Sequence, residues 1–169
     1  MTTQNHERLL GWLKDAYAME QEAETMMTAM ASRIEHYPEL RARIEQHVEE
    51  TRQQAAQLAN CIEQMGGSLP TARGAVAKGM AAMHAAGNAM MSDEVAKGIG
   101  ISYAFEHMEI ASYRALLVAA RRVGHAEVVR VCEAILEQEQ AMADWLFERQ
   151  PELIEAFLDR EEADMQAKR

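Results

Sequence analysis

Apolar side chains recur every three or four residues over most of this chain, the spacing that places them on one face of an α-helix. The pattern predicts a first helix over about residues 3–36 and a second over about 38–65. Pro38 fits the first turn of the second helix, where its missing N–H costs nothing, and Gly66-Gly67 is a typical helix end. Because the connection between them is very short, we expect the two helices to be antiparallel neighbours.

The second half of the chain repeats this arrangement after a break. Ser, Pro and Gly interrupt an Ala- and Met-rich segment, so residues 66–92 are predicted to form a crossover connection. Periodic stretches then predict a third helix over about 93–123 and a fourth over about 125–149. Pro151 is expected to close the fourth helix and to start a short terminal helix over about 151–163, which would dock on the bundle.

Composition agrees with an all-α protein. Apolar residues make up 49% of the chain, and prolines number only 3. The composition is dominated by residues that favour helices, namely Ala, Leu, Met, Glu, Gln and Arg. Two helical hairpins joined by one long connection predict a four-helix bundle in a single domain, residues 1–169. An elongated coiled coil is the alternative, but strict heptads are not sustained.

Charge and cysteine content exclude several classes of function. The net charge of −10 leaves no basic patch for binding nucleic acid. No apolar stretch is long enough for a membrane span, and the first residues lack the pattern of a signal peptide. Cys61 and Cys132 are far apart and have no CxxC spacing, so we expect two free thiols in a reduced, cytoplasmic protein.

Carboxylates interrupt the apolar face of the predicted third helix. Glu106 and Glu109 lie one turn apart and share that face with Ile110 and Tyr113. Burying carboxylates is costly unless a positive group receives them. A similar Tyr-Ala-x-Glu pattern places Glu20 on the first helix. The anomaly therefore occurs in both halves of the chain.

The remaining long helices carry comparable groups, His47 and Glu50 on the second and Glu139 on the fourth. A buried acid or histidine taken alone is usually only hydrogen-bonded, but their coincidence on four helices favours a metal centre. Bridging carboxylates neutralise and space two divalent ions, here iron or manganese, and imidazole completes the coordination. We further expect Glu50 and Glu106 to face each other across the core. The predicted ligands are Glu20, His47, Glu50, Glu106, Glu109 and Glu139.

These motifs together resemble a known family. They are Leu13-Lys-Asp-Ala-Tyr-Ala-Met-Glu20, His47-Val-Glu-Glu-Thr51, Glu106-His-Met-Glu-Ile-Ala-Ser-Tyr113 and Leu136-Glu-Gln-Glu139. The resemblance, over about residues 7–147, is to the ferritin-like bacterial stress proteins typified by YciE and YciF. It implies a ferritin-like four-helix bundle, related to rubrerythrins and manganese catalases, that forms a homodimer. The resemblance says more about the fold and the bound metal than about the reaction that the protein would catalyse. The usual Glu-x-x-His order is not met, which predicts a carboxylate-rich, histidine-poor site.

Two functions remain open from the sequence. The first is a di-metal redox protein that reacts with oxygen or peroxide in stress defence, with Tyr17, Tyr103 and Tyr113 either packing in the core or hydrogen-bonding to ligands. The alternative is a non-catalytic helical dimer with a structural or vestigial metal site. A dimer is expected in both cases because several helix faces are apolar nearly all round. The residues that indicate this second surface are Met26, Met30, Ala111, Leu116 and Val118.

Overall fold

Four long helices form the protein in this computed structural model, which describes residues 3–70 and 93–163. Their bounds are α1 Thr3–Arg33, α2 Pro38–Gln64, α4 Glu94–Val123 and α5 Ala126–Glu162. No strand occurs within the described ranges, and the predicted all-α class is confirmed. Most of the predicted crossover, residues 66–92, lies outside the described residues. None of the described helices contains a long enough apolar stretch for a membrane span.

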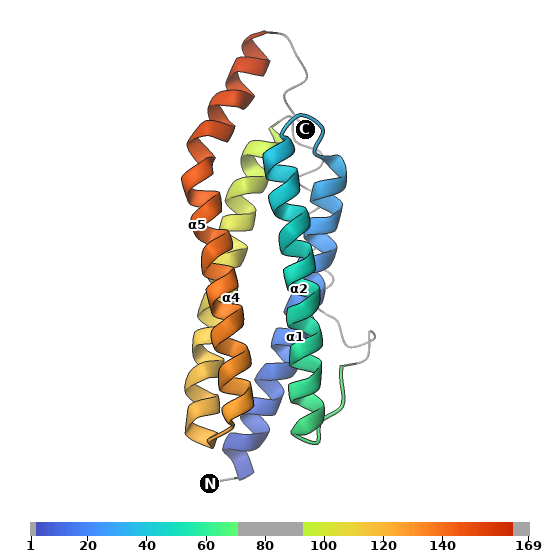
Figure 1. Cartoon of the computed structure of the whole chain (residues 1–169), viewed down its shortest axis with the longest axis vertical. Coiled ribbons are helices and arrows are strands. Elements are labelled where there is room, and N and C mark those ends of the chain that lie inside the picture. Colours follow the sequence, from blue (N-terminus) through green and yellow to red (C-terminus); the bar gives the residue numbers. More distant parts are fainter. Residues whose placement is uncertain (1–2, 71–92, 164–169) are drawn as a thin grey trace.

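The helices pack as an antiparallel four-helix bundle (Figure 1). α1 packs against α2 and α4, and α5 packs against α4 and α2. α2 ends at one end of the bundle and α4 begins at the opposite end. This is the arrangement that a crossover between two helical hairpins requires.

Glycines end two of the helices. Gly66 after α2 and Gly124 after α4 adopt φ of 77° and 78°, the left-handed conformation that glycine enters without strain. Gly67 allows a close approach, because a Cβ at this position would lie 2.6 Å from Cδ1 of Leu10. The end of α2 can therefore pack directly on α1. At the other end of the hairpin, Tyr37 precedes Pro38 and adopts non-helical φ −125° and ψ 72°.

The predicted helix boundaries were wrong in two places. α1 ends at Arg33 rather than near His36, and α5 continues through Pro151, where a fourth helix was expected to end and a separate terminal helix to begin. Proline removes one helical hydrogen bond, but residues 147–150 are exposed, so solvent can satisfy the carbonyl that loses its partner. Beyond Pro151, Phe157 is buried in an apolar cluster of the core, and this packing holds the last turns of α5 against the bundle.

A buried polar layer divides the core into two apolar clusters. One cluster includes Leu9, Leu58 and Ile135, and both cysteines, Cys61 and Cys132, are buried in it. The other cluster gathers apolar residues at the opposite end of the bundle. Between them on each helix lie polar residues that are almost completely inaccessible to solvent. This polar layer consists of Glu20, His47, Thr51, Gln54, Glu106, Glu109 and Glu139.

Candidate metal centre

Each helix supplies the polar layer from the middle of its apolar face. α1 contributes Glu20 and α5 contributes Glu139, each flanked along its helix by residues of the two apolar clusters. α4 contributes Glu106 and Glu109, which the helical repeat places on one face one turn apart. Because the surrounding apolar residues fix how each helix is rotated, these side chains point toward the same interior space.

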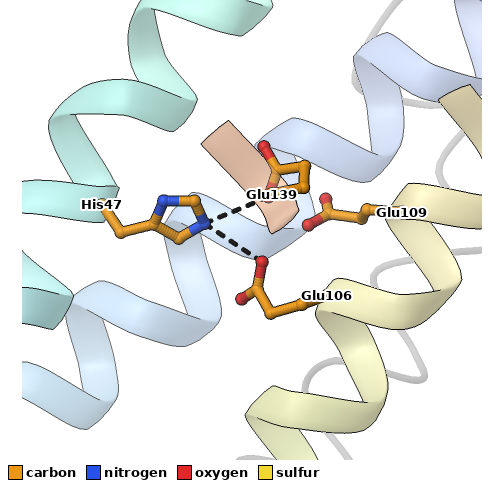
Figure 2. Close-up of side chains that lie close together, drawn as sticks. All are labelled: His47, Glu106, Glu109 and Glu139. Atoms are coloured by element: carbon orange, nitrogen blue, oxygen red, sulfur yellow. Dashed lines mark hydrogen bonds and ion pairs between the residues drawn. The ribbon is translucent and has the colours of Figure 1, made fainter. Parts of the chain in front are cut away.

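Four of the predicted ligands converge. His47, Glu106, Glu109 and Glu139 each offer a ligand atom, and these atoms lie within 4.8 Å of one another. Figure 2 shows the imidazole of His47 directed at the carboxylates of α4 and α5. Its Nε2 lies 3.2 Å from Oε2 of Glu106 and 3.2 Å from Oε2 of Glu139. Glu20 lies outside this group of four but is fully buried, and the hydroxyl of Tyr113 donates to its Oε1.

Glu50 lies behind His47 rather than inside the group of four. Its Oε2 is 2.7 Å from Nδ1 of His47 and 3.3 Å from Nη1 of Arg43, and 20% of its side chain is exposed. The expectation that Glu50 and Glu106 face each other directly was wrong. The imidazole of His47 lies between them, with Nδ1 against Glu50 and Nε2 against Glu106.

Three groups of the centre carry charge readily despite their burial. Burial opposes the charge of His47, but hydrogen bonds with Glu106, Glu139 and Glu50 outweigh it and raise its pKa to about 11. Burial alone would raise the pKa of Glu50, yet the contacts with His47, Gln46 and Arg43 lower it to about 2. The pKa of Glu139 is likewise lowered, mainly because His47 is close enough to overcome the effect of burial.

The other acids resist ionisation. Burial, followed by the charge of Glu139, raises the pKa of Glu20 to about 8. Burial also raises the pKa of Glu106 to about 7, although His47 lowers it in part. The pKa of Glu109 lies well above its usual value because it is buried beside the carboxylates of Glu20, Glu139 and Glu106. One imidazolium therefore does not neutralise the four buried glutamates.

The residues present fit a divalent metal centre. Buried carboxylate oxygens almost always have a hydrogen-bond partner, but Oε2 of Glu20 and Oε1 of Glu109 have none among the described residues. Carboxylate and imidazole donors are a set that iron and manganese accept. Metal ions would supply both the missing positive charge and a partner for these oxygens.

Sequence reasoning missed one contributor, Gln54. Gln54 is fully buried and donates to Glu139, although its place directly after Arg52 and Gln53 has the pattern of a solvated surface. Its position seven residues after His47, two helical turns on, was the available signal.

Of the three tyrosines considered from the sequence, Tyr113 is hydrogen-bonded to a predicted ligand, since its hydroxyl donates to Glu20. Tyr103 makes an edge-on ring contact with His107 at 4.4 Å, and the hydroxyl of Tyr17 accepts from Gln21.

The fold and this centre define a four-helix bundle with a candidate metal site at mid-length. The chain belongs to the family described as a domain of unknown function (DUF892), whose profile matches residues 4–159.

Solved structures similar to this chain include three bacterial proteins. A protein of Xanthomonas campestris is 59% identical, with a TM-score of 0.81 over 94% of this chain and 99% of that one. YcfI of Rhodopseudomonas palustris, which has been suggested to be a structural protein, is 25% identical, with a TM-score of 0.73 over 86% and 93% of the two chains. The stress protein YciF of Escherichia coli is 20% identical, with a TM-score of 0.77 over 88% and 96%, a similarity that concerns the fold. The family match and these structures support the resemblance to YciF-type proteins.

Proposed function

We propose that this protein binds two divalent metal ions, iron or manganese, in its polar layer and uses them to oxidise iron(II) or to remove peroxide during stress. The observation that carries this proposal is the convergence of His47 and three buried glutamates on one interior space, with a fourth buried glutamate, Glu20, close enough to interact with their charges. The ferritin-like relation suggested by the sequence motifs, and a location in the cytoplasm, belong to the same proposal.

The donor set divides between the group of four and Glu20. One ion would be held by His47, Glu106, Glu109 and Glu139. Glu20 would provide a further carboxylate for the second ion. Four carboxylates balance the charge of two divalent ions. Such ions, when bound, supply Lewis acidity and, for iron and manganese, a change of oxidation state.

The protein's own residues prepare His47 for this role. A histidine that ligates a metal usually donates its other ring N–H to a carboxylate, which fixes the tautomer and the ring orientation. Nδ1 of His47 lies 2.7 Å from Oε2 of Glu50, and Glu50 is itself held by Arg43 and Gln46. Nε2 is thereby directed at Glu106 and Glu139. The apolar clusters on both sides exclude bulk water from the reacting space.

A non-catalytic bundle is the second candidate, and one observation favours it. His47 pairs with Glu50, Glu106 and Glu139 at once, so ion pairs hold much of the polar layer together without any further group. In that case a metal ion would only fasten the helices.

Metal analysis combined with turnover separates these functions. Protein purified without chelators should contain about two iron or manganese ions per chain, and the reduced form should consume iron(II) with oxygen or peroxide over many turnovers. Bound metal without turnover would favour the non-catalytic bundle. Protein that neither retains nor binds iron(II) or manganese(II) would refute the di-metal function and leave the bundle held by ion pairs alone.

We infer that the protein acts as a homodimer, joined through the outer face of α1 and α4. On α4 the exposed apolar residues follow the alternating spacing of a coiled-coil seam, Ala104, Met108, Ala111, Ala115 and Val118. Beside them, a groove of about 250 Å³ between α1 and α4 is lined in part by Trp12, Asp15 and Met19.

The exposed fractions on this face are large for apolar side chains: 40% for Trp12, 49% for Met108 and 68% for Val118. Met30 and Leu116, which also indicated a second surface, are instead buried in the bundle's own core. Sedimentation should give a dimer for the wild type and a monomer for Val118→Glu. A 19.0 kDa monomer for both would refute the dimer.

A further inference from the structure

Gln54 is the one neutral amide in the polar layer. It is completely buried on α2, and its Nε2 lies 2.5 Å from Oε1 of Glu139 and 3.0 Å from Oε1 of Gln138. A glutamine amide has two N–H donors, and these two contacts use both. Its Oε1 is also buried, yet has no hydrogen-bond partner in residues 3–70 and 93–163.

These contacts determine how Glu139 is oriented. Gln54 holds Oε1 of Glu139 from the side of α2, and this leaves Oε2 directed at the interior, 3.2 Å from Nε2 of His47. An amide nitrogen can only donate, so Gln54 stabilises Glu139 as a carboxylate acceptor in this one orientation. The unpartnered Oε1 of Gln54 is costly to bury, and it offers an acceptor to a protic ligand of the centre, such as water.

We propose that Gln54 is a positioning residue of the metal centre and sets its preference for divalent over trivalent ions. It orients Glu139 toward the ions, and its neutral side chain limits the acids of the polar layer to Glu20, Glu106, Glu109 and Glu139. Four negative charges match two divalent ions. A fifth, placed on α2 next to Glu139, would favour ions of higher charge, because charge–charge interactions are strong away from water. This inference rests on the proposed metal-binding function.

Two variants separate orientation from charge. Gln54→Met keeps a side chain of similar length but removes the donors to Glu139, whereas Gln54→Glu keeps the shape and adds a charge. Gln53→Met is the matched control, since Gln53 is the exposed neighbour on the same helix. All are prepared as metal-free, full-length protein. Manganese(II) affinity is measured by calorimetry and terbium(III) affinity by luminescence, and circular dichroism verifies folding.

The orientation role predicts that Gln54→Met weakens manganese(II) binding by about 10- to 100-fold, the usual effect of losing a residue that supports a ligand. Gln53→Met should bind like the wild type. The charge role predicts that Gln54→Glu raises the ratio of terbium(III) to manganese(II) affinity, a shift that a packing defect alone would not produce.

The outcomes distinguish this inference from the function on which it rests. If the wild type binds no manganese(II), both fail. If the wild type binds and Gln54→Met binds equally well, the inference is overturned and the metal centre stands. If Gln54→Met does not fold, Gln54→Glu decides, and an unchanged terbium-to-manganese ratio overturns the inference.

Discussion

Glu109 is buried among three other carboxylates, and these surroundings suit a negative charge poorly. It is 1% exposed, its Oε1 has no hydrogen-bond partner within the described part of the chain, and its neighbours include the carboxylates of Glu20, Glu106 and Glu139. Burial and these neighbours hold its pKa well above the usual 4.5. Without metal, ionised Glu109 is therefore costly in the folded protein, whereas in the unfolded chain it ionises without this cost.

This difference fixes the sign and size of the effect of Glu109→Gln. Keeping a carboxyl with an unfolded pKa of 4.5 protonated costs about 1.4 kcal/mol per pH unit above that value, so the cost of burying Glu109 at pH 7 has an upper limit of about 3 kcal/mol. Glutamine has nearly the same shape and needs no proton. Glu109→Gln should then stabilise the metal-free protein by up to about 3 kcal/mol at pH 7, and by about 1–2 kcal/mol if the wild-type site relaxes. Below pH 4.5 the carboxyl of Glu109 is protonated in both the folded and the unfolded state, so burying it requires no proton uptake. The stability gained by Glu109→Gln should therefore vanish near pH 4.5 and grow as pH rises.

The assay is unfolding in guanidinium chloride, followed by circular dichroism, at pH 5, 6, 7 and 8 with a chelator. Glu137→Gln is the control, since Glu137 is exposed on α5 close to Glu139, and it should change stability by less than about 0.5 kcal/mol. With manganese(II) the sign should reverse, because the wild type gains ligand-linked stability that the variant loses. Loss of stability in Glu109→Gln with chelator, or a gain independent of pH, would refute the reasoning.

Three further predictions follow from the same geometry. The metal-free wild type should lose stability in thermal melts as pH rises from about 5 to about 8, because Glu20 and Glu106, with pKa about 8 and about 7, retain protons in the core that the unfolded chain releases near pH 4.5; a flat profile would contradict this. Glu50→Gln should destabilise the metal-free protein by about 1–2 kcal/mol at pH 7, since it removes the carboxylate that pairs with His47, and unchanged or increased stability in denaturant would contradict it. Tyr113→Phe should cost about 1–3 kcal/mol by leaving Oε1 of Glu20 without its donor, a loss that would be absent in melts if the hydrogen bond contributes nothing.

Much of the fold could be predicted because helical periodicity is local. The spacing of apolar residues indicated the four helices, and the acids that interrupt it indicated the polar layer. Glu106 and Glu109 needed only the helical repeat, since residues one turn apart share a face and the apolar neighbours determine which face is buried. The start of α2 at Pro38 was equally local.

The position of Glu50 could not be predicted in the same way. His47 and Glu50 lie one turn apart, but three residues of an α-helix turn through about 300°, which leaves them about 60° apart around the axis. His47 points straight inward and is fully buried, so Glu50 falls at the edge of the core and is partly exposed. Gln54, seven residues after His47, is only about 20° away and is completely buried. Which of the two residues would point inward depended on how α2 is rotated in the bundle.

Pro151 posed a different problem. A proline inside a helix usually kinks or ends it, because it removes a hydrogen bond and crowds the preceding turn. Whether that cost is tolerated depends on the exposure of the preceding turn and on what the later residues contact. Here residues 147–150 face solvent, and Phe157 is buried in the apolar cluster at the end of the bundle opposite Leu9, Leu58 and Ile135. Both features depend on tertiary structure and could not be predicted from the local sequence.

Proton release offers a direct test of whether the polar layer receives metal ions. At pH 7 the metal-free layer holds protons on His47 and Glu20, which have pKa values of about 11 and about 8. The pKa of Glu109 is raised by burial and by its acidic neighbours, which favours a proton there as well. Ligation requires carboxylates and a neutral imidazole, so metal binding must displace these protons.

Manganese(II) titrations in two buffers of different ionisation enthalpy should then report release of about two to three protons per chain at pH 7. Affinity should rise steeply with pH, while the stability of the metal-free protein falls over the same range. The two trends oppose each other because the same carboxylates repel one another without metal and coordinate it when it is present. Binding without proton release would mean that manganese(II) is held by exposed acids on the surface, and the polar layer would then be an ion-paired core with no metal-binding role.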